Sequence, residues 1–167
     1  TEDLFRGDGV RMLTAGTLEQ LNNTTNQTFL GTFVGLTGVE MRSDSSGEHP
    51  GFWDFSAAPS ANALICYAQG GTIYEIQEDG DSSRLALTDI GGGVQVIGGS
   101  TGSTTTGISG MEIDSSPGST ASSSEPLNLL RLVDRPDNVI GTSALPNARW
   151  LVTGLDIQFS TKSTVLG

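Results

Sequence analysis

Apolar residues alternate with polar ones in several short runs of this chain, and that spacing is typical of β-strands. Two of these runs are Phe29–Met41 and Leu127–Val133, and a third extends from Trp150 to Phe159. In Phe29–Met41 both parities carry apolar residues, so we expect a strand that is covered on both faces. Glycines at positions 31, 35 and 38 predict bends or bulges within it.

The run near the C-terminus changes parity part-way along. Trp150 and Val152 lie on one parity, whereas Leu155, Ile157 and Phe159 lie on the other. A one-residue shift moves side chains to the opposite face of a sheet. We therefore expect a β-bulge at Gly154 that keeps one face buried.

The densest group of apolar β-formers is the segment 63–80, which reads ALICYAQGGTIYEIQEDG. Its runs Leu64–Tyr67 and Thr72–Ile76 flank Gly70-Gly71. A two-glycine loop between β-prone runs predicts a hairpin, because glycine reaches positive φ without strain. We expect this hairpin near the centre of the core, with Glu78–Asp81 as an exposed acidic turn. The side chains expected to hold the core together are Tyr67, Ile73, Tyr74 and Ile76.

Shorter strands are predicted in the middle of the chain, at Arg84–Leu87, Val94–Ile97 and Gly110–Asp114. Gly, Ser and Thr dominate residues 98–124. Such a composition offers too little apolar surface to offset the entropy lost in ordering a packed core. We therefore interpret residues 98–124 as long loops around one short strand.

Residues 1–28 are predicted to form an extended N-terminal arm. Their apolar residues are separated by polar residues and glycines, with Leu4, Phe5 and Met12 among the anchors. Thr17–Leu21 has the pattern of a helical turn that begins at a threonine cap. An arm of this kind would lie over its own domain or over a neighbouring subunit.

These segments predict an all-β fold class. We expect a single domain, built as a β-barrel or β-sandwich of roughly seven to nine short strands with long Gly/Ser/Thr-rich loops. The predicted arm covers residues 1–28 and the β domain covers residues 29–167. A chain of 167 residues is long enough to bury a core without disulfides or metal, and its single cysteine excludes an intrachain disulfide.

Charge narrows the function classes. The chain holds 19 acidic and eight basic residues, which give a formal net charge of −11. Nucleic-acid binding needs a basic stripe, and an anionic membrane repels an acidic protein, so neither partner is expected. A partner with basic patches fits better. No apolar run approaches the ~18 residues of a membrane span, and TEDLFRGDGV lacks the features of a secretory signal.

Candidate catalytic residues are sparse. His49, the only histidine, lies in a loop of glycine and serine, and Cys66 lies in an apolar run where a small buried hydrophobic residue is expected. Nineteen acids favour some close carboxylate pair, but no pattern marks one as a glycosidase pair. Glu78–Asp81 lacks the spacing of a calcium loop. We expect no enzyme activity, no cofactor and no metal.

Two short motifs have little weight. Arg6-Gly7-Asp8 spells the tripeptide that integrin ligands present, and three Asn-X-Thr sequences lie between Asn22 and Thr28. Matches of this length are frequent by chance, and the Asn-X-Thr sequences fit an ordinary polar turn.

One charged group consists of Arg131, Asp134, Arg135, Asp137 and Arg149. It predicts a local network of arginines and aspartates that fixes a turn. The alternative is an arginine contact to another subunit, because arginine is favoured at interfaces.

The order of these segments resembles that in structural proteins of tailed-bacteriophage virions. The segments are FVGLTGVEM, FWDF and ALICYAQGGTIYEIQEDG, then Gly107-Ile108-Ser109-Gly110 in the Gly/Ser/Thr-rich stretch, and LLRLVDRPDN at Leu129–Asn138. The resemblance covers roughly residues 29–140. It is more specific as an ordered set than in any single motif.

The resemblance implies a non-enzymatic virion protein of the head decoration or cement type, which binds the outer surface of the assembled capsid and stabilises it. The implied partner is the major capsid protein of the same virion, together with self-association as trimers. The implied location is the capsid exterior, after synthesis in the cytoplasm of the bacterial host.

For this role the predicted partner contacts are Leu4, Phe5, Arg6, Met12, Arg131 and Arg135. Two alternatives stay open. One is another virion role, in the tail, the neck or fibre attachment. The other is a carbohydrate-binding β-sandwich adhesin, in which Phe52, Trp53 and Trp150 would stack on sugar rings.

Overall fold

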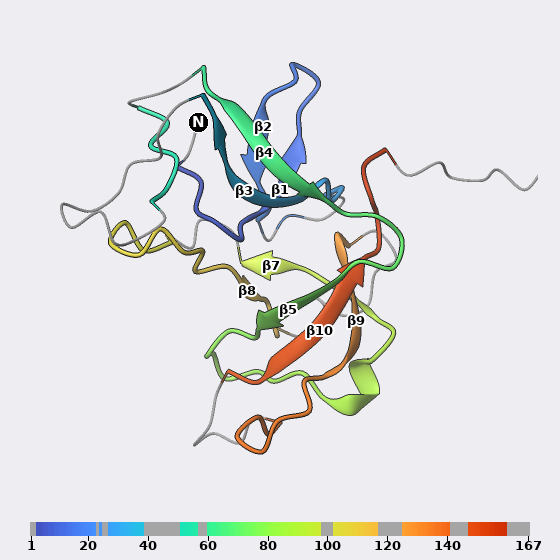
Figure 1. The fold of residues 1–167 in the computed structure, drawn as a ribbon. Helices are drawn as coiled ribbons and strands as arrows, with labels where there is room; N and C mark the ends of the chain where they lie inside the picture. The colour runs from blue at the N-terminus through green and yellow to red at the C-terminus, as the bar shows by residue number, and fades with distance from the viewer. Residues whose placement is uncertain are drawn as a thin grey trace, which may run out of the picture.

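The chain is all-β in the computed structural model, as predicted. The structure describes residues 3–22, 24, 27–38, 51–56, 60–97, 102–116, 125–140 and 147–159. These hold ten short strands in two four-stranded sheets and one two-stranded sheet, all antiparallel, with no closed barrel. The first sheet lies above the second in Figure 1, and the two-stranded sheet lies between them. Within the same residues no helix is long and apolar enough to span a membrane.

The first sheet has the strand order β2-β1-β3-β4. Its strands are β1 (Gly9–Met12), β2 (Leu18–Gln20), β3 (Gly31–Thr37) and β4 (Asn62–Tyr67). The register of β3 and β4 is irregular between Phe33 and Gly35, and Val34 between them is exposed. Only one face of β3 is therefore covered, which corrects the prediction of a strand buried on both sides. The core of this sheet contains Leu4, Val10, Leu30, Phe33 and Trp53.

The N-terminal segment belongs to this sheet, so the prediction of an extended arm is wrong for its described residues. β1 and β2 pair with Val10 opposite Gln20 and Met12 opposite Leu18. Thr17–Leu21 is therefore largely strand, and the predicted helical turn does not form. A five-residue helix satisfies few of its own backbone groups, whereas pairing with β1 satisfies them and helps to bury Val10.

The second sheet has the strand order β5-β10-β9-β6. Its strands are β5 (Ile73–Gln77), β6 (Gly93–Val94), β9 (Leu127–Leu132) and β10 (Arg149–Gly154). Trp150 and Val152 are fully buried on one face of β10, as their parity predicts. The register irregularity lies between Leu151 and Val152, and β10 ends at Gly154. The bulge predicted at Gly154 is wrong in position, because the strand stops there and the chain bends away.

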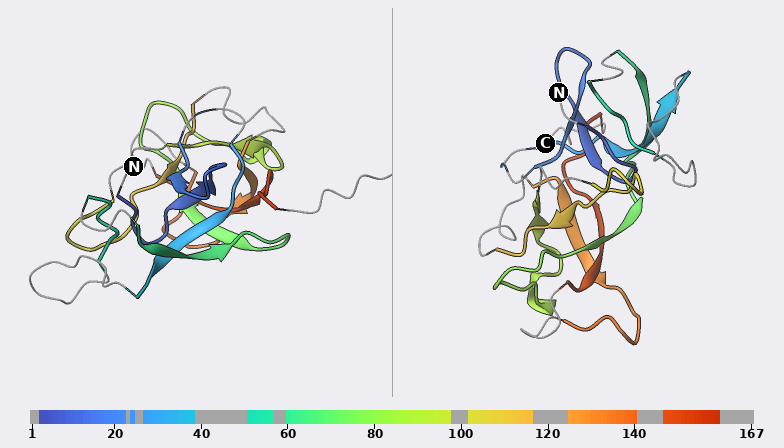
Figure 2. Two further views of the ribbon diagram at one scale, coloured as in Figure 1. Left: turned by 90° about the horizontal axis from the view of Figure 1, so that it is seen from above. Right: turned by 90° about the vertical axis from the view of Figure 1, so that its left-hand side faces the viewer.

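The core of the second sheet also draws on residues from outside it. Its largest buried side chains are Leu21, Phe29, Leu85, Ile113, Leu129 and Trp150. Leu21 follows β2 and Phe29 precedes β3, so the ends of strands in the first sheet pack against the core of the second. Figure 2 shows the two sheets as upper and lower parts in a further view.

The middle of the chain joins the sheets at Gln95. β6 ends at Val94 in the second sheet, and β7 (Val96–Ile97) pairs with β8 (Glu112–Ile113) in the two-stranded sheet. The single strand predicted at Val94–Ile97 is thus two strands in different sheets. The strand predicted at Gly110–Asp114 is confirmed by β8.

The strand predicted at Arg84–Leu87 is wrong. Leu85 is buried against the second core, but the backbone there pairs with no strand, and a 3-10 turn follows at Leu87–Asp89. One buried leucine in an irregular segment accounts for the apolar signal.

The segment 63–80 does not form a hairpin. β4 pairs with β3 and β5 pairs with β10, so its two apolar runs belong to different sheets. The predicted turn does form: the Thr72 N–H donates to the Gln69 carbonyl at 2.9 Å, and Gly71 has a φ of 96°. The turn carries the chain from the first sheet to the second (Figure 1).

The side chains of this segment are more exposed than predicted. Tyr67 and Ile73 are 55% and 56% exposed, and Cys66 is exposed as well. Tyr74 and Ile76 do pack partly against the second core. The cause is that β4 and β5 are each the edge strand of their sheet, so neighbours cover them on fewer sides.

Candidate partner-binding surface

The described residues hold no cluster suited to metal binding. No group of three or more His, Cys, Asp or Glu in those ranges could hold a metal ion. Cys66 lies exposed on β4, which corrects the prediction that it is buried. His49 lies outside the described residues.

The acidic turn after β5 has a structural role. Glu78 is fully buried and accepts hydrogen bonds from the backbone N–H groups of Leu85 and Ala148 and from the indole of Trp150, at 3.2 to 3.3 Å. One carboxyl group therefore joins β5, β10 and the loop before the 3-10 turn. The prediction of an exposed turn is wrong for this residue.

Asp79 is buried too. Its Oδ1 accepts the backbone N–H of Ser115 at 3.0 Å and also the Ser115 hydroxyl, while the Ser116 hydroxyl donates to Asp81 at 3.3 Å. These bonds fasten the chain after β8 to the turn after β5. The carboxyl groups are used within the fold, so they offer no argument for a cation site.

Arg6-Gly7-Asp8 is not presented as an adhesion motif. Asp8 is fully buried, and its Oδ2 accepts the Phe5 N–H at 2.8 Å. Burial raises the pKa of the Asp8 carboxyl above its ordinary value of 3.8, and the hydrogen bond from Phe5 opposes this rise. An integrin-type receptor needs an exposed carboxylate, which this fold does not provide at Asp8.

Replacing Asp8 by asparagine should stabilise the protein at neutral pH. A carboxyl with a raised pKa contributes its full stability below about 3.8 and loses it as the pH rises through the folded-state pKa. Asp8→Asn keeps an oxygen for the Phe5 N–H and carries no charge. Urea unfolding should therefore show a stability gain over the wild type that is small at pH 3.5 and larger at pH 7.

The matched control is Asp137→Asn, which removes the same charge from an exposed turn. It should show a much weaker pH-dependent difference from the wild type. An equal pH dependence in the two variants would mean that the protein's overall negative charge, and not the burial of Asp8, is responsible.

The six predicted partner contacts are scattered. Leu4 and Phe5 are buried, and Phe5 stacks on Phe52 with ring centroids 5.0 Å apart, so burial in the core corrects their prediction as surface contacts. Arg6 is exposed beside the space between the sheets, Met12 is partly buried on β1, and Arg131 is exposed on β9.

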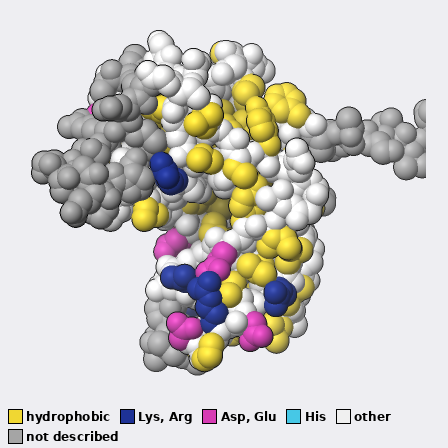
Figure 3. Space-filling model, in the orientation of Figure 1, with side chains coloured by type: hydrophobic (Ala, Val, Ile, Leu, Met, Phe, Trp, Pro, Cys, Tyr) yellow, Lys and Arg dark blue, Asp and Glu magenta, His cyan; other side chains and the backbone are white. Residues whose placement is uncertain are grey.

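Arg135 lies in a charged network, but with a different acid from the one predicted. Arg135 and Arg149 both donate to the Glu75 carboxylate on β5, at 2.8 and 3.3 Å. The predicted partners Asp134 and Asp137 are not in this network. Its members are exposed, so it contributes little to stability. Figure 3 shows basic and acidic side chains gathered on the lower part of the molecule.

The aromatic residues considered for sugar stacking are buried. Phe52 and Trp53 belong to the interior around the first sheet, and Trp150 is fully buried in the second core. A stacking platform needs an exposed ring face. The carbohydrate-binding alternative therefore loses the residues on which it depended.

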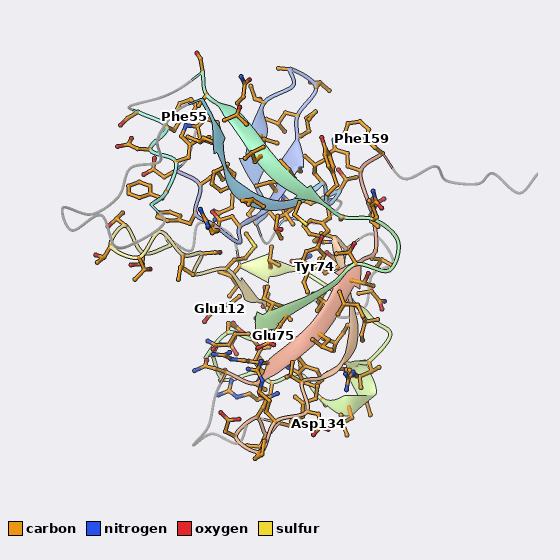
Figure 4. The ribbon with its side chains drawn as sticks, viewed as in Figure 1. Phe55, Tyr74, Glu75, Glu112, Asp134 and Phe159 are labelled. Carbon is orange, nitrogen blue, oxygen red and sulfur yellow. The ribbon has the colours of Figure 1, made fainter. Side chains whose placement is uncertain are left out.

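A cleft of about 500 Å³ lies between the two sheets. Figure 3 shows this hollow with hydrophobic side chains inside it, and Figure 4 shows Tyr74 between the sheets. The Tyr74 ring meets Phe29 edge-on at 5.4 Å, and its buried hydroxyl has no hydrogen-bond partner among the described residues. Burial, with a smaller effect of Cys66, raises the pKa of Tyr74 to about 12. The Tyr74 hydroxyl therefore keeps its proton at neutral pH.

A second hollow of about 740 Å³ opens on the first sheet. We call it the edge groove, because both edge strands of the sheet, β2 and β4, line it. It is defined by Met12, Leu18, Trp53, Phe55, Ala63 and Ile65, with Leu4 at its floor. Figure 4 labels Phe55 beside this sheet.

The edge groove brings together only two of the predicted contacts, Leu4 and Met12. The other residues of the groove were not predicted as partner contacts. Leu18 was interpreted as part of a helical turn, and Ala63 and Ile65 as part of a central hairpin. The available signal was alternation: Ala63 and Ile65 share one parity of β4, and Leu64 and Cys66 share the other. That alternation marks a strand with two different faces.

No protein-family model matches this chain, and comparisons with curated proteins and with solved structures give no significant match.

Proposed function

We propose that this chain is a non-enzymatic structural protein of a tailed-bacteriophage virion, a head decoration or cement protein that binds the outer surface of the assembled shell. The observation that carries the proposal is the ordered set of segments TIYEIQEDG, GISG and LLRLVDRPDN. An all-β domain supports a binding role, because both edges of its first sheet are unpaired among the described residues and a groove lined mostly by apolar side chains lies beside them.

Charge supports the outer surface of the shell as the location. The chain carries a net charge of −11, so packaged nucleic acid inside the head repels it. Many copies would bridge neighbouring units of the major capsid protein, with self-association into trimers as part of the arrangement. Apolar area buried at each junction then opposes rupture of the shell.

Co-sedimentation tests this function. Purified protein is mixed with mature, expanded heads that lack it, and the heads are pelleted. We expect saturable recovery with the expanded heads and much less with heads that already carry the protein. Failure to pellet with expanded heads would exclude the decoration role. Gold labels confined to a single vertex would instead assign the protein to the neck or tail.

A further inference from the structure

The two edges of the first sheet are both open in the described part of the chain. β2 pairs only with β1, and β4 pairs only with β3. Each edge therefore presents backbone N–H and C=O groups on its outer side. Such edges are templates for an additional strand from another chain.

These two edges line the same groove, and most of the side chains that line it are apolar. Trp53 and Leu4 lie buried beneath it, while Leu18 on β2 and Ile65 on β4 are half-buried at its sides. A bound strand would form hydrogen bonds with the unpaired backbone of an edge. The apolar side chains on one of its faces would then cover Leu18 or Ile65. β4 is six residues long, so a bound strand of similar length would span about 20 Å.

The net charge of the whole chain, and not a free charge in the groove, favours one kind of partner segment. Among the described residues that line the groove, Glu19 is the charged one. Its carboxylate already forms an ion pair with Arg11. The proposed trimers would form elsewhere on the molecule, because this chain, with 19 acidic and only eight basic residues, is a poor source of a basic segment. A segment with basic residues from another protein is attracted by the net charge of −11.

We propose that the edge groove binds an extended segment of a partner protein that has apolar residues at alternate positions and basic residues between them. The segment pairs with β4 or β2 and places its apolar side chains over Trp53. This inference rests on the proposed function in one respect: if that function is correct, the bound segment belongs to a shell protein. The groove itself can be tested apart from the heads.

The probe is a synthetic eight-residue peptide that repeats Val-Lys-Val-Thr, titrated into the full chain by calorimetry. We expect saturable binding that weakens with added salt, and at least about tenfold weaker binding of the matching Val-Glu-Val-Thr peptide. Amide hydrogen exchange should slow in β4 or β2 on binding, and not in β9 or β10.

Two neighbouring residues on β4 supply a matched pair of variants. Ala63 lines the groove, whereas Leu64 is exposed on the opposite face. Ala63→Trp should weaken peptide binding at least about tenfold by filling the groove, and Leu64→Trp should not change it. Thr17→Trp, at an exposed position on the β2 side, provides a second obstruction that leaves the core untouched.

Three results would overturn the inference. They are no binding of the basic peptide, binding that survives both Ala63→Trp and Thr17→Trp, and concentration-dependent self-association that Ala63→Trp abolishes.

Sedimentation with heads separates this inference from the proposed function. If Ala63→Trp loses the peptide but still pellets with heads, the groove is not the shell contact and the proposed function stands. If the wild type binds the peptide but not the heads, the proposed function fails and the groove stands as a peptide site.

Discussion

Glu78→Ala should lower the free energy of unfolding by roughly 2–5 kcal/mol. The Glu78 carboxyl is fully buried and accepts three hydrogen bonds, from Leu85, Ala148 and Trp150. Alanine leaves these three donors buried without an acceptor, and each unsatisfied donor is costly. Chemical denaturation followed by the fluorescence of the two tryptophans gives the measurement.

The comparison for this variant is Glu112→Ala. Glu112 is partly buried and accepts one hydrogen bond, from Gln77 at 2.9 Å, so its loss should cost about 0.5–1.5 kcal/mol. Glu78→Gln keeps one acceptor oxygen and should fall between the wild type and Glu78→Ala. Equal costs for Glu78→Ala and Glu112→Ala would show that the three buried donors do not depend on Glu78.

Gly31→Ala should cost roughly 2–4 kcal/mol. Gly31 lies opposite Tyr67 in the pairing of β3 with β4. A Cβ at Gly31 would overlap the Cys66 carbonyl oxygen and lie 2.9 Å from the Tyr67 Cα. Both obstacles are backbone atoms, so no side-chain rotation relieves the overlap. The pairing at the end of β4 would have to open, and thermal unfolding should show a lower midpoint.

Gly70→Ala is the control for this substitution. Gly70 lies in the turn between β4 and β5, and a Cβ there meets nothing within 4 Å. Alanine at this position should cause no loss of stability, because it also reduces the freedom of the unfolded chain. A similar loss in both variants would contradict the close approach of β3 and β4 at Gly31.

Local patterns in the sequence predicted strands well where one face is strongly apolar. Trp150 and Val152 show this, as does Leu127–Val133, because alternation reports directly on burial of one face.

The turn at Gly70-Gly71 was also predicted correctly. Its flanking strands were assigned to each other wrongly, because β5 pairs with β10, which lies more than 70 residues further along the chain. Strand pairing at that separation leaves no local signal.

The edge groove could not be predicted for a related reason. Its walls come from the β1–β2 hairpin, from Trp53 and Phe55, and from β4, and only the fold brings these together. Thr17–Leu21 is too short for periodicity to separate a strand from a helical turn. The sequence therefore predicted Leu4 and Met12 as contacts but gave no indication of the surface that Met12 shares with Ala63 and Ile65.

An image reconstruction of the virion tests the central claim most directly. Particles with and without this protein are compared, and the difference density is located on the shell. The decoration role predicts density on the outer surface in many copies, around each local symmetry axis of the expanded head. Difference density confined to one vertex or to the tail, or no difference on the head, would contradict it.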